Sequence, residues 1–171
     1  KKQDKIFFKG AMKGERIKML NEFKKNGLEV TSGSNERLNY SEYLVQLKSY
    51  KYGLSPYGNT TPDTLRIYEY LENGVLPILG SRQSFDYFIL LFEESPPFLY
   101  GKSWKQVSRK FILKKYIAKQ NINLKIIKWW ERKKEIYKIK CNLLISIDVY
   151  ELNNCIKIKK DYLIRIMSFI W

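Results

Sequence analysis

The chain has 171 residues, a formal net charge of +15, two cysteines and no histidine. That length suits a single domain with an appendage. The absence of histidine excludes His-based catalytic triads and most metal sites that depend on imidazole. Cys141 and Cys155 are too few and too far apart for a metal framework, so they either form a disulfide in an oxidising compartment or remain free thiols.

The first hundred residues or so alternate short apolar segments with amphipathic ones. Apolar runs predict strands at residues 5–8, 28–31, 50–54 and 75–79. Helical periodicity between them predicts helices at residues 16–25, 39–47 and 62–73. Alternation of this kind predicts an α/β fold with a Rossmann-like, mostly parallel sheet flanked by helices. In such a sheet, ligands bind beyond the carboxyl ends of the strands.

The segment from Ser49 to Leu79 carries the strongest local signals. Thr61 followed by Pro62 predicts an N-cap and a proline at the first helical position. Gly74 supplies the signal for the end of that helix. The apolar stripe expected on the helix consists of Leu65, Ile67, Tyr68 and Leu71.

Two charged residues, Arg66 and Glu69, lie near the start of this predicted helix. Their spacing of three places them on one face. A helix N-terminus has unpaired N–H groups and a positive dipole charge, so an arginine beside it predicts a phosphate site. A carboxylate one turn further along can accept hydrogen bonds from two sugar hydroxyls. The alternative is an ordinary surface ion pair between the two side chains.

Three motifs follow one another here: Gly-Leu-Ser-Pro-x-Gly at residues 53–58, Arg66-x-x-Glu69, and Gly-Val-Leu-Pro-Ile at residues 74–78. In order and spacing they resemble the donor-binding half of exostosin-type glycosyltransferases. Val75 is a loose fit, because the family usually has a small residue or cysteine there. The resemblance covers about Ile6 to Trp104.

Members of that family are inverting enzymes of the two-domain GT-B architecture that use nucleotide sugars, such as those of xylose, glucuronic acid or galactose. The resemblance therefore implies a nucleotide-sugar donor as substrate and a glycan or glycoprotein as acceptor. The sequence contains no Asp-x-Asp metal motif, so we expect the transfer to need no metal cofactor.

The resemblance also assigns roles to individual residues. Arg66 would meet the diphosphate and Glu69 the ribose. Ser55, Gly58 and Thr64 would line the phosphate loop, with turn chemistry as the alternative explanation for those three. Exostosin-type enzymes carry an arginine near the first predicted helix, which makes Arg16 a second phosphate candidate.

The chain offers only part of what a complete transfer requires. A GT-B enzyme places its active site between two Rossmann-like domains, and only the donor half is recognisable. Because the sequence begins with Lys1, we expect it to be a fragment that lacks an N-terminal acceptor domain. The general base remains unassigned, because nothing distinguishes Glu36, Glu42 and Asp86 from ordinary surface acids. The resemblance implies the Golgi membrane in a eukaryote and the cytoplasm in a microbe or virus.

Residues beyond Leu79 give weaker signals. Residues 85–92 form a dense apolar run that is too short to cross a bilayer and fits either a buried helix or a strand. We divide the chain into a donor-binding domain at residues 1–115 and a basic extension, rich in lysine, isoleucine and asparagine, at residues 116–171.

Charge is concentrated towards the C-terminus. Residues 1–101 hold 14 basic and 12 acidic side chains, whereas residues 102–171 hold 18 basic and 5 acidic ones. Such a basic segment arises from compositional drift or binds nucleic acid, anionic lipid or acidic glycan. No motif for specific nucleic-acid recognition accompanies it. A polyanion-binding module on an α/β scaffold is therefore the alternative function, and an inactive glycosyltransferase fragment is a third.

Overall fold

The structure is a computed structural model of the chain. It describes residues 2–11, 14–31, 38–58, 62–112 and 122–146, and for residues 4, 110–112, 122 and 141–146 it describes the backbone alone. The chain divides into two compact units, residues 1–127 and residues 128–171. The expected boundary at residue 116 falls in a stretch outside the described residues.

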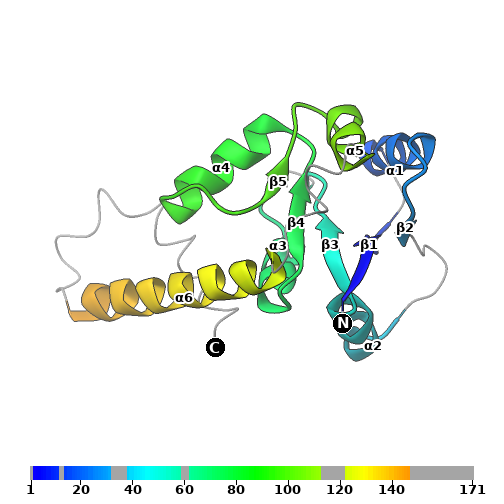
Figure 1. Ribbon diagram of the computed structural model, residues 1–171. Coiled ribbons are helices and arrows are strands. Elements are labelled where there is room, and N and C mark those ends of the chain that lie inside the picture. Colours follow the sequence, from blue (N-terminus) through cyan, green and yellow to red (C-terminus); the bar gives the residue numbers. More distant parts are fainter. Residues whose placement is uncertain (1, 12–13, 32–37, 59–61, 113–121, 147–171) are drawn as a thin grey trace. The chain divides into compact units, whose positions relative to one another are not determined.

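A five-stranded sheet forms the centre of the first unit (Figure 1). In spatial order its strands are β2 (Val30–Thr31), β1 (Gln3–Phe7), β3 (Tyr50–Leu54), β4 (Leu76–Leu79) and β5 (Leu99–Tyr100). All neighbouring strands pair in parallel. The α/β fold with a Rossmann-like parallel sheet is therefore confirmed. Pro77 occupies a position in β4 opposite Gly53, although proline cannot donate to the ladder.

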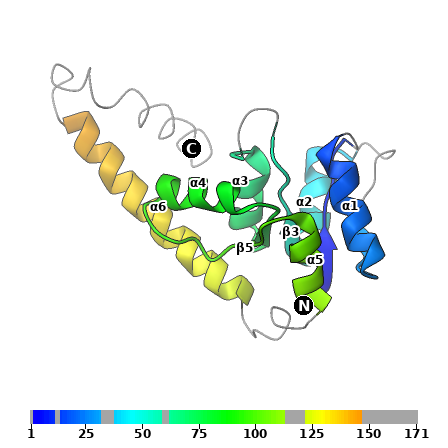
Figure 2. The same ribbon diagram turned by 90° about the horizontal axis from the view of Figure 1, so that it is seen from above.

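Helices connect the strands and cover both faces of the sheet (Figure 2). In chain order the helices of the first unit are α1 (Glu15–Lys25), α2 (Tyr40–Lys48), α3 (Leu65–Glu72), α4 (Arg82–Phe92) and α5 (Trp104–Ile112). Helix α6 (Ile122–Ser146) follows them in the chain. On the face that carries α2 and α3, the buried residues Phe7, Leu47, Tyr70 and Val75 form one cluster. On the opposite face α1 packs against α5, where the rings of Phe23 and Trp104 lie 6.2 Å apart.

The order of strands reverses direction between β1 and β3. The chain passes from β1 to β2 on one side and then returns beyond β1 to form β3 on the other side. The connection that leaves the carboxyl end of β1 leads to β2, whereas the connection that leaves the carboxyl end of β3 leads to β4 on the other side. These two connections therefore diverge between β1 and β3. In open α/β sheets this switch point is where ligands bind.

Helix α3 begins later than the sequence predicts. Its N-cap is Thr64, in an extended conformation with φ −124° and ψ 150°, and Leu65 is its first residue. The expected start at Pro62 is therefore wrong, because the buried Pro62 lies in the preceding loop; Thr61 lies outside the described residues. Gly74, at φ 60°, follows the C-cap and ends the helix as predicted.

Burial on α3 also differs in part from the predicted stripe. Ile67, Tyr68 and Leu71 are buried as expected, whereas Leu65 is 67% exposed. Tyr70 is buried instead, because Gly53 leaves room for its ring. A Cβ atom on Gly53 would lie 2.5 Å from that ring.

The apolar run at residues 85–92 belongs to helix α4, which resolves the choice between helix and strand. Ser81 caps this helix, because its hydroxyl accepts a hydrogen bond from the Ser84 N–H. None of the helices described combines the length and the apolar character that a membrane crossing needs.

Helix α6 continues from the first unit into the second. In the first unit, Asn123 donates to the carbonyls of Lys51 at 3.0 Å and of Gly74 at 2.6 Å. In the second unit, Glu131–Lys134 and Glu135–Lys138 form salt bridges of 2.8 and 3.1 Å with i,i+3 spacing. The start of α6 is therefore part of the sheet domain.

Candidate functional site

Arg66 lies where the turn after β1 meets the start of α3. Its Nη2 donates a 2.9 Å hydrogen bond to the carbonyl of Lys9, and its guanidinium lies 5.1 Å from the centroid of the Phe8 ring. Gly10 permits this approach, because a Cβ atom there would lie 2.9 Å from Nη2. The arginine expected to meet a diphosphate therefore stands at the switch point between β1 and β3.

A second arginine, Arg16, approaches the same turn from α1. Its Nη1 donates to the carbonyl of Ala11 at 3.1 Å. Burial, and then the positive charge of Arg66, lower the pKa of the Arg16 guanidinium. Within the part of the chain that the structure describes, neither arginine forms a salt bridge. The pair therefore carries positive charge that no described carboxylate neutralises, which suits an anionic ligand.

The buried polar atoms of this region that have no hydrogen-bond partner among the described residues include Ser55 Oγ, Thr64 Oγ1 and Arg66 Nε. Ser55 directly follows β3 and is 4% exposed, while Thr64 caps α3 without a side-chain cap bond. A buried polar atom without a partner destabilises the fold by about 1–3 kcal/mol. Their presence on three residues predicted from sequence to contact phosphate indicates a place for a polar ligand.

The loop between β3 and α3 is only partly described. Gly58 is half-buried, and residues 59–61, which follow it, lie outside the described residues. The structure therefore brings Arg66 and Arg16 to one turn and places Ser55 and Thr64 at the two ends of this loop. It gives Gly58 no contact with either arginine.

Glu69 interacts with α2 and not with Arg66. The hydroxyl of Tyr43 donates a 2.7 Å hydrogen bond to Glu69 Oε2. Among the residues described, no salt bridge joins Glu69 to Arg66, so the predicted alternative of an ordinary ion pair does not occur here. Among the hydrogen bonds between described residues, none ends on the other carboxylate oxygen of Glu69.

Sequence analysis did not identify Tyr43 as part of the site. Burial, the nearby Tyr70 and the hydrogen bond to Glu69 raise the pKa of Tyr43, so its hydroxyl stays protonated and donates at neutral pH. A buried tyrosine needs a hydrogen-bond partner for its hydroxyl. This need was the only feature of the sequence that could have pointed to Tyr43. The sequence predicts only a helix at residues 39–47, which does not show where the hydroxyl of Tyr43 finds its partner.

The acids considered as general bases have other interactions or lie outside the described residues. Glu42 forms a capping box with Asn39, because each side chain accepts from the other residue's N–H. Asp86 pairs with Arg82 at 2.7 Å. Glu36 lies outside the described residues. The catalytic base therefore stays unassigned.

Neither protein-family profiles nor curated proteins give a match for this chain. Within the described residues, no three side chains of the His, Cys, Asp or Glu type gather as a metal site would require. Transfer without a metal stays a prediction from the sequence.

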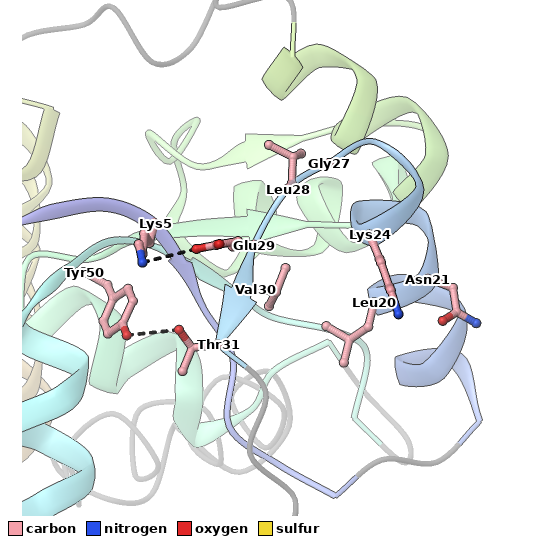
Figure 3. Close-up of a pocket in the computed structure, with 10 residues that line it drawn as sticks. All are labelled: Lys5, Leu20, Asn21, Lys24, Gly27, Leu28, Glu29, Val30, Thr31 and Tyr50. Atoms are coloured by element: carbon pink, nitrogen blue, oxygen red, sulfur yellow. Dashed lines mark hydrogen bonds and ion pairs between the residues drawn. The ribbon is translucent and has the colours of Figure 1, made fainter.

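A hollow of about 670 Å³ lies elsewhere, beside the edge strand β2 and helix α1 (Figure 3). Lys5 and Glu29 form a 3.2 Å salt bridge in its wall, and Thr31 donates to the Tyr50 hydroxyl at 3.0 Å. None of the six residues predicted from sequence lines this hollow. Because none of the predicted residues lies there, and Lys5 and Glu29 already pair with each other, we place the candidate site at the switch point instead.

Proposed function

We propose that the first unit binds a nucleotide-sugar donor and that the protein acts as an exostosin-type glycosyltransferase. In this proposal it transfers the sugar to a glycan or glycoprotein acceptor. The observation that carries the proposal is the position of Arg66 and Arg16, which approach one turn at the β1/β3 switch point without a described carboxylate partner. Guanidinium groups bind phosphate oxygens through charge-assisted, often bidentate hydrogen bonds.

The start of α3 supports binding of the diphosphate. Arg66 is the second residue of this helix, so its charge adds to that of the exposed N–H groups of the first turn. Ser55 Oγ and Thr64 Oγ1 provide further hydrogen-bonding atoms that lack a described partner. Glu69, one turn beyond Arg66, supports the ribose assignment, because Tyr43 fixes one carboxylate oxygen and leaves the other for a sugar hydroxyl.

The chemistry assigned to this unit is stabilisation of the departing diphosphate. When the sugar leaves with inversion, negative charge grows on the leaving group, and Arg66 and Arg16 are placed to balance it. The acceptor hydroxyl needs a general base, which we expect from an acceptor domain. In a eukaryote the proposal places the enzyme at the Golgi membrane, and in a microbe or virus in the cytoplasm.

The proposal predicts that Arg66→Ala weakens binding of UDP to the full chain at least about tenfold, because it removes charge-assisted hydrogen bonds. Isothermal titration calorimetry measures this directly. Arg109→Ala is the matched control, since Arg109 is an exposed arginine on α5 with no role in the site. We expect the control to bind UDP as the unchanged protein does.

Two outcomes would contradict this assignment. Equal affinity of Arg66→Ala and the unchanged chain for UDP would remove Arg66 from the site. Binding that survives the substitution, falls steeply with salt and is matched by a single-stranded oligonucleotide would favour a polyanion-binding module. The excess of basic residues at 102–171 is the observation that favours a polyanion-binding module.

A further inference from the structure

Two tyrosines near the start of α2 lie beside Glu69. Tyr40 is the first residue of the helix and Tyr43 follows three positions later, so both side chains share one face. Their rings are stacked at a centroid distance of 6.2 Å and an interplanar angle of 20°. Tyr43 is half-buried against Phe7, at 5.5 Å between centroids, whereas Tyr40 is 61% exposed.

Glu69 connects this aromatic pair to the candidate site. Tyr43 donates its hydroxyl to Glu69 at 2.7 Å. Tyr40 stacks on Tyr43 and so lies one ring away from the residue that holds this carboxylate. Burial, and then the negative charge of Glu69, raise the pKa of Tyr40. The positive charge of Arg66 lowers the pKa of Tyr43, but burial and the neighbouring Tyr70 and Glu69 raise it by more. The charges of Glu69 and Arg66 therefore both act on Tyr43.

We propose that Tyr40 is the platform on which the nucleobase of the donor stacks, with Tyr43 as the residue that positions Glu69 for the ribose. This inference rests on the proposed function. In a nucleoside diphosphate the ribose joins the phosphates to the base, so a nucleotide with its phosphates at Arg66 and its ribose at Glu69 extends its base past Glu69. Tyr40 is the exposed ring that stacks on Tyr43, the residue bonded to that carboxylate.

The properties of Tyr40 suit this role. A tyrosine ring offers a large apolar face at little conformational cost, and aromatic stacking accepts any base because every base has a π-face. Its partner Tyr43 is held by Phe7 and by Glu69, so the pair is ordered before a ligand arrives. The capping box of Asn39 and Glu42 fixes the helix end that carries Tyr40.

Calorimetry with two probes separates the base from the phosphates. UDP carries phosphates, ribose and base, whereas inorganic pyrophosphate carries the phosphates alone. We expect Tyr40→Ala to weaken UDP binding about tenfold and to leave pyrophosphate binding unchanged, because stacking on one ring contributes on this scale. Tyr40→Phe keeps the ring, and we expect it to bind UDP as the unchanged chain does.

Each result bears on one claim. If Tyr40→Ala binds UDP with unchanged affinity, or loses UDP and pyrophosphate equally, the platform is wrong while the phosphate site stands. If the unchanged chain binds pyrophosphate and UDP equally tightly, the base makes no contact and the inference fails alone. If the unchanged chain binds neither probe, the proposed function and this inference both fail.

Discussion

Gly10 determines where the guanidinium of Arg66 lies. The turn after β1 passes so close to the side chain that a methyl group on Gly10 would meet Nη2 at 2.9 Å. Nη2 of Arg66 donates to the carbonyl of Lys9, and this is the only hydrogen bond that Arg66 makes with the described residues. The absence of a side chain at one position therefore keeps Arg66 at the switch point.

We expect Gly10→Ala to weaken UDP binding several-fold with little change in the free energy of unfolding. The atom in the way is the end of a flexible side chain, so Arg66 moves and the backbone does not have to. Gly27→Ala is the control, because Gly27 has φ 69° with open space around it. A side chain at a residue in that conformation destabilises the folded protein by roughly 1–2 kcal/mol. We therefore expect the control to lose stability and to keep UDP affinity, as urea unfolding and calorimetry would measure; the reverse pattern would disprove the role of Gly10.

At the scale of elements, the hydrogen bond from Tyr43 to Glu69 joins α2 to α3, and Tyr70 joins α3 to β3. Tyr70 is fully buried and donates to the Leu54 carbonyl at 2.9 Å. Burial raises the pKa of Tyr70 and of Tyr43 above the ordinary tyrosine value. The helices α2 and α3 are therefore held to the sheet partly by hydroxyl groups that must remain protonated.

This arrangement predicts a loss of stability in alkali. Both tyrosines stay protonated in the folded protein while those of the unfolded chain ionise above about pH 10, so the free energy of unfolding falls as the pH rises beyond that point. Below about pH 10 the contribution is fully present. Urea midpoints measured on either side of that pH test the claim. The free energy of unfolding of Tyr43→Phe should fall less steeply with pH than that of the unchanged chain. An identical slope for the two proteins would contradict the prediction.

The sequence predicts the start or end of a helix correctly only where the local signals agree with the packing of the folded chain. The capped start of α2 and the end of α3 at Gly74 follow local rules. Thr61 and Pro62 also satisfy a local rule, but the helix start that they predict is wrong. Pro62 is buried in the loop, and the helix begins after Thr64. Tertiary packing overrode local preference there.

For the whole molecule, alternation along the chain was enough to predict a parallel α/β sheet, whereas the order of its strands was not predictable. Strand order depends on the side to which each connection crosses, and no local pattern encodes that choice. The convergence of Arg66 and Arg16 was likewise expected only through the family resemblance. The contact of Tyr43 with Glu69 requires α2 and α3 to lie side by side, which periodicity cannot reveal.

The most direct test of the central claim is a map of backbone amide NMR shifts while UDP is titrated into the full chain. We predict the largest changes in the turn after β1, at the end of β3 and at the start of α3, which include Gly10, Ser55 and Arg66. Changes concentrated on α6 or around the hollow beside β2, or none at all, would contradict a nucleotide site at the β1/β3 switch point.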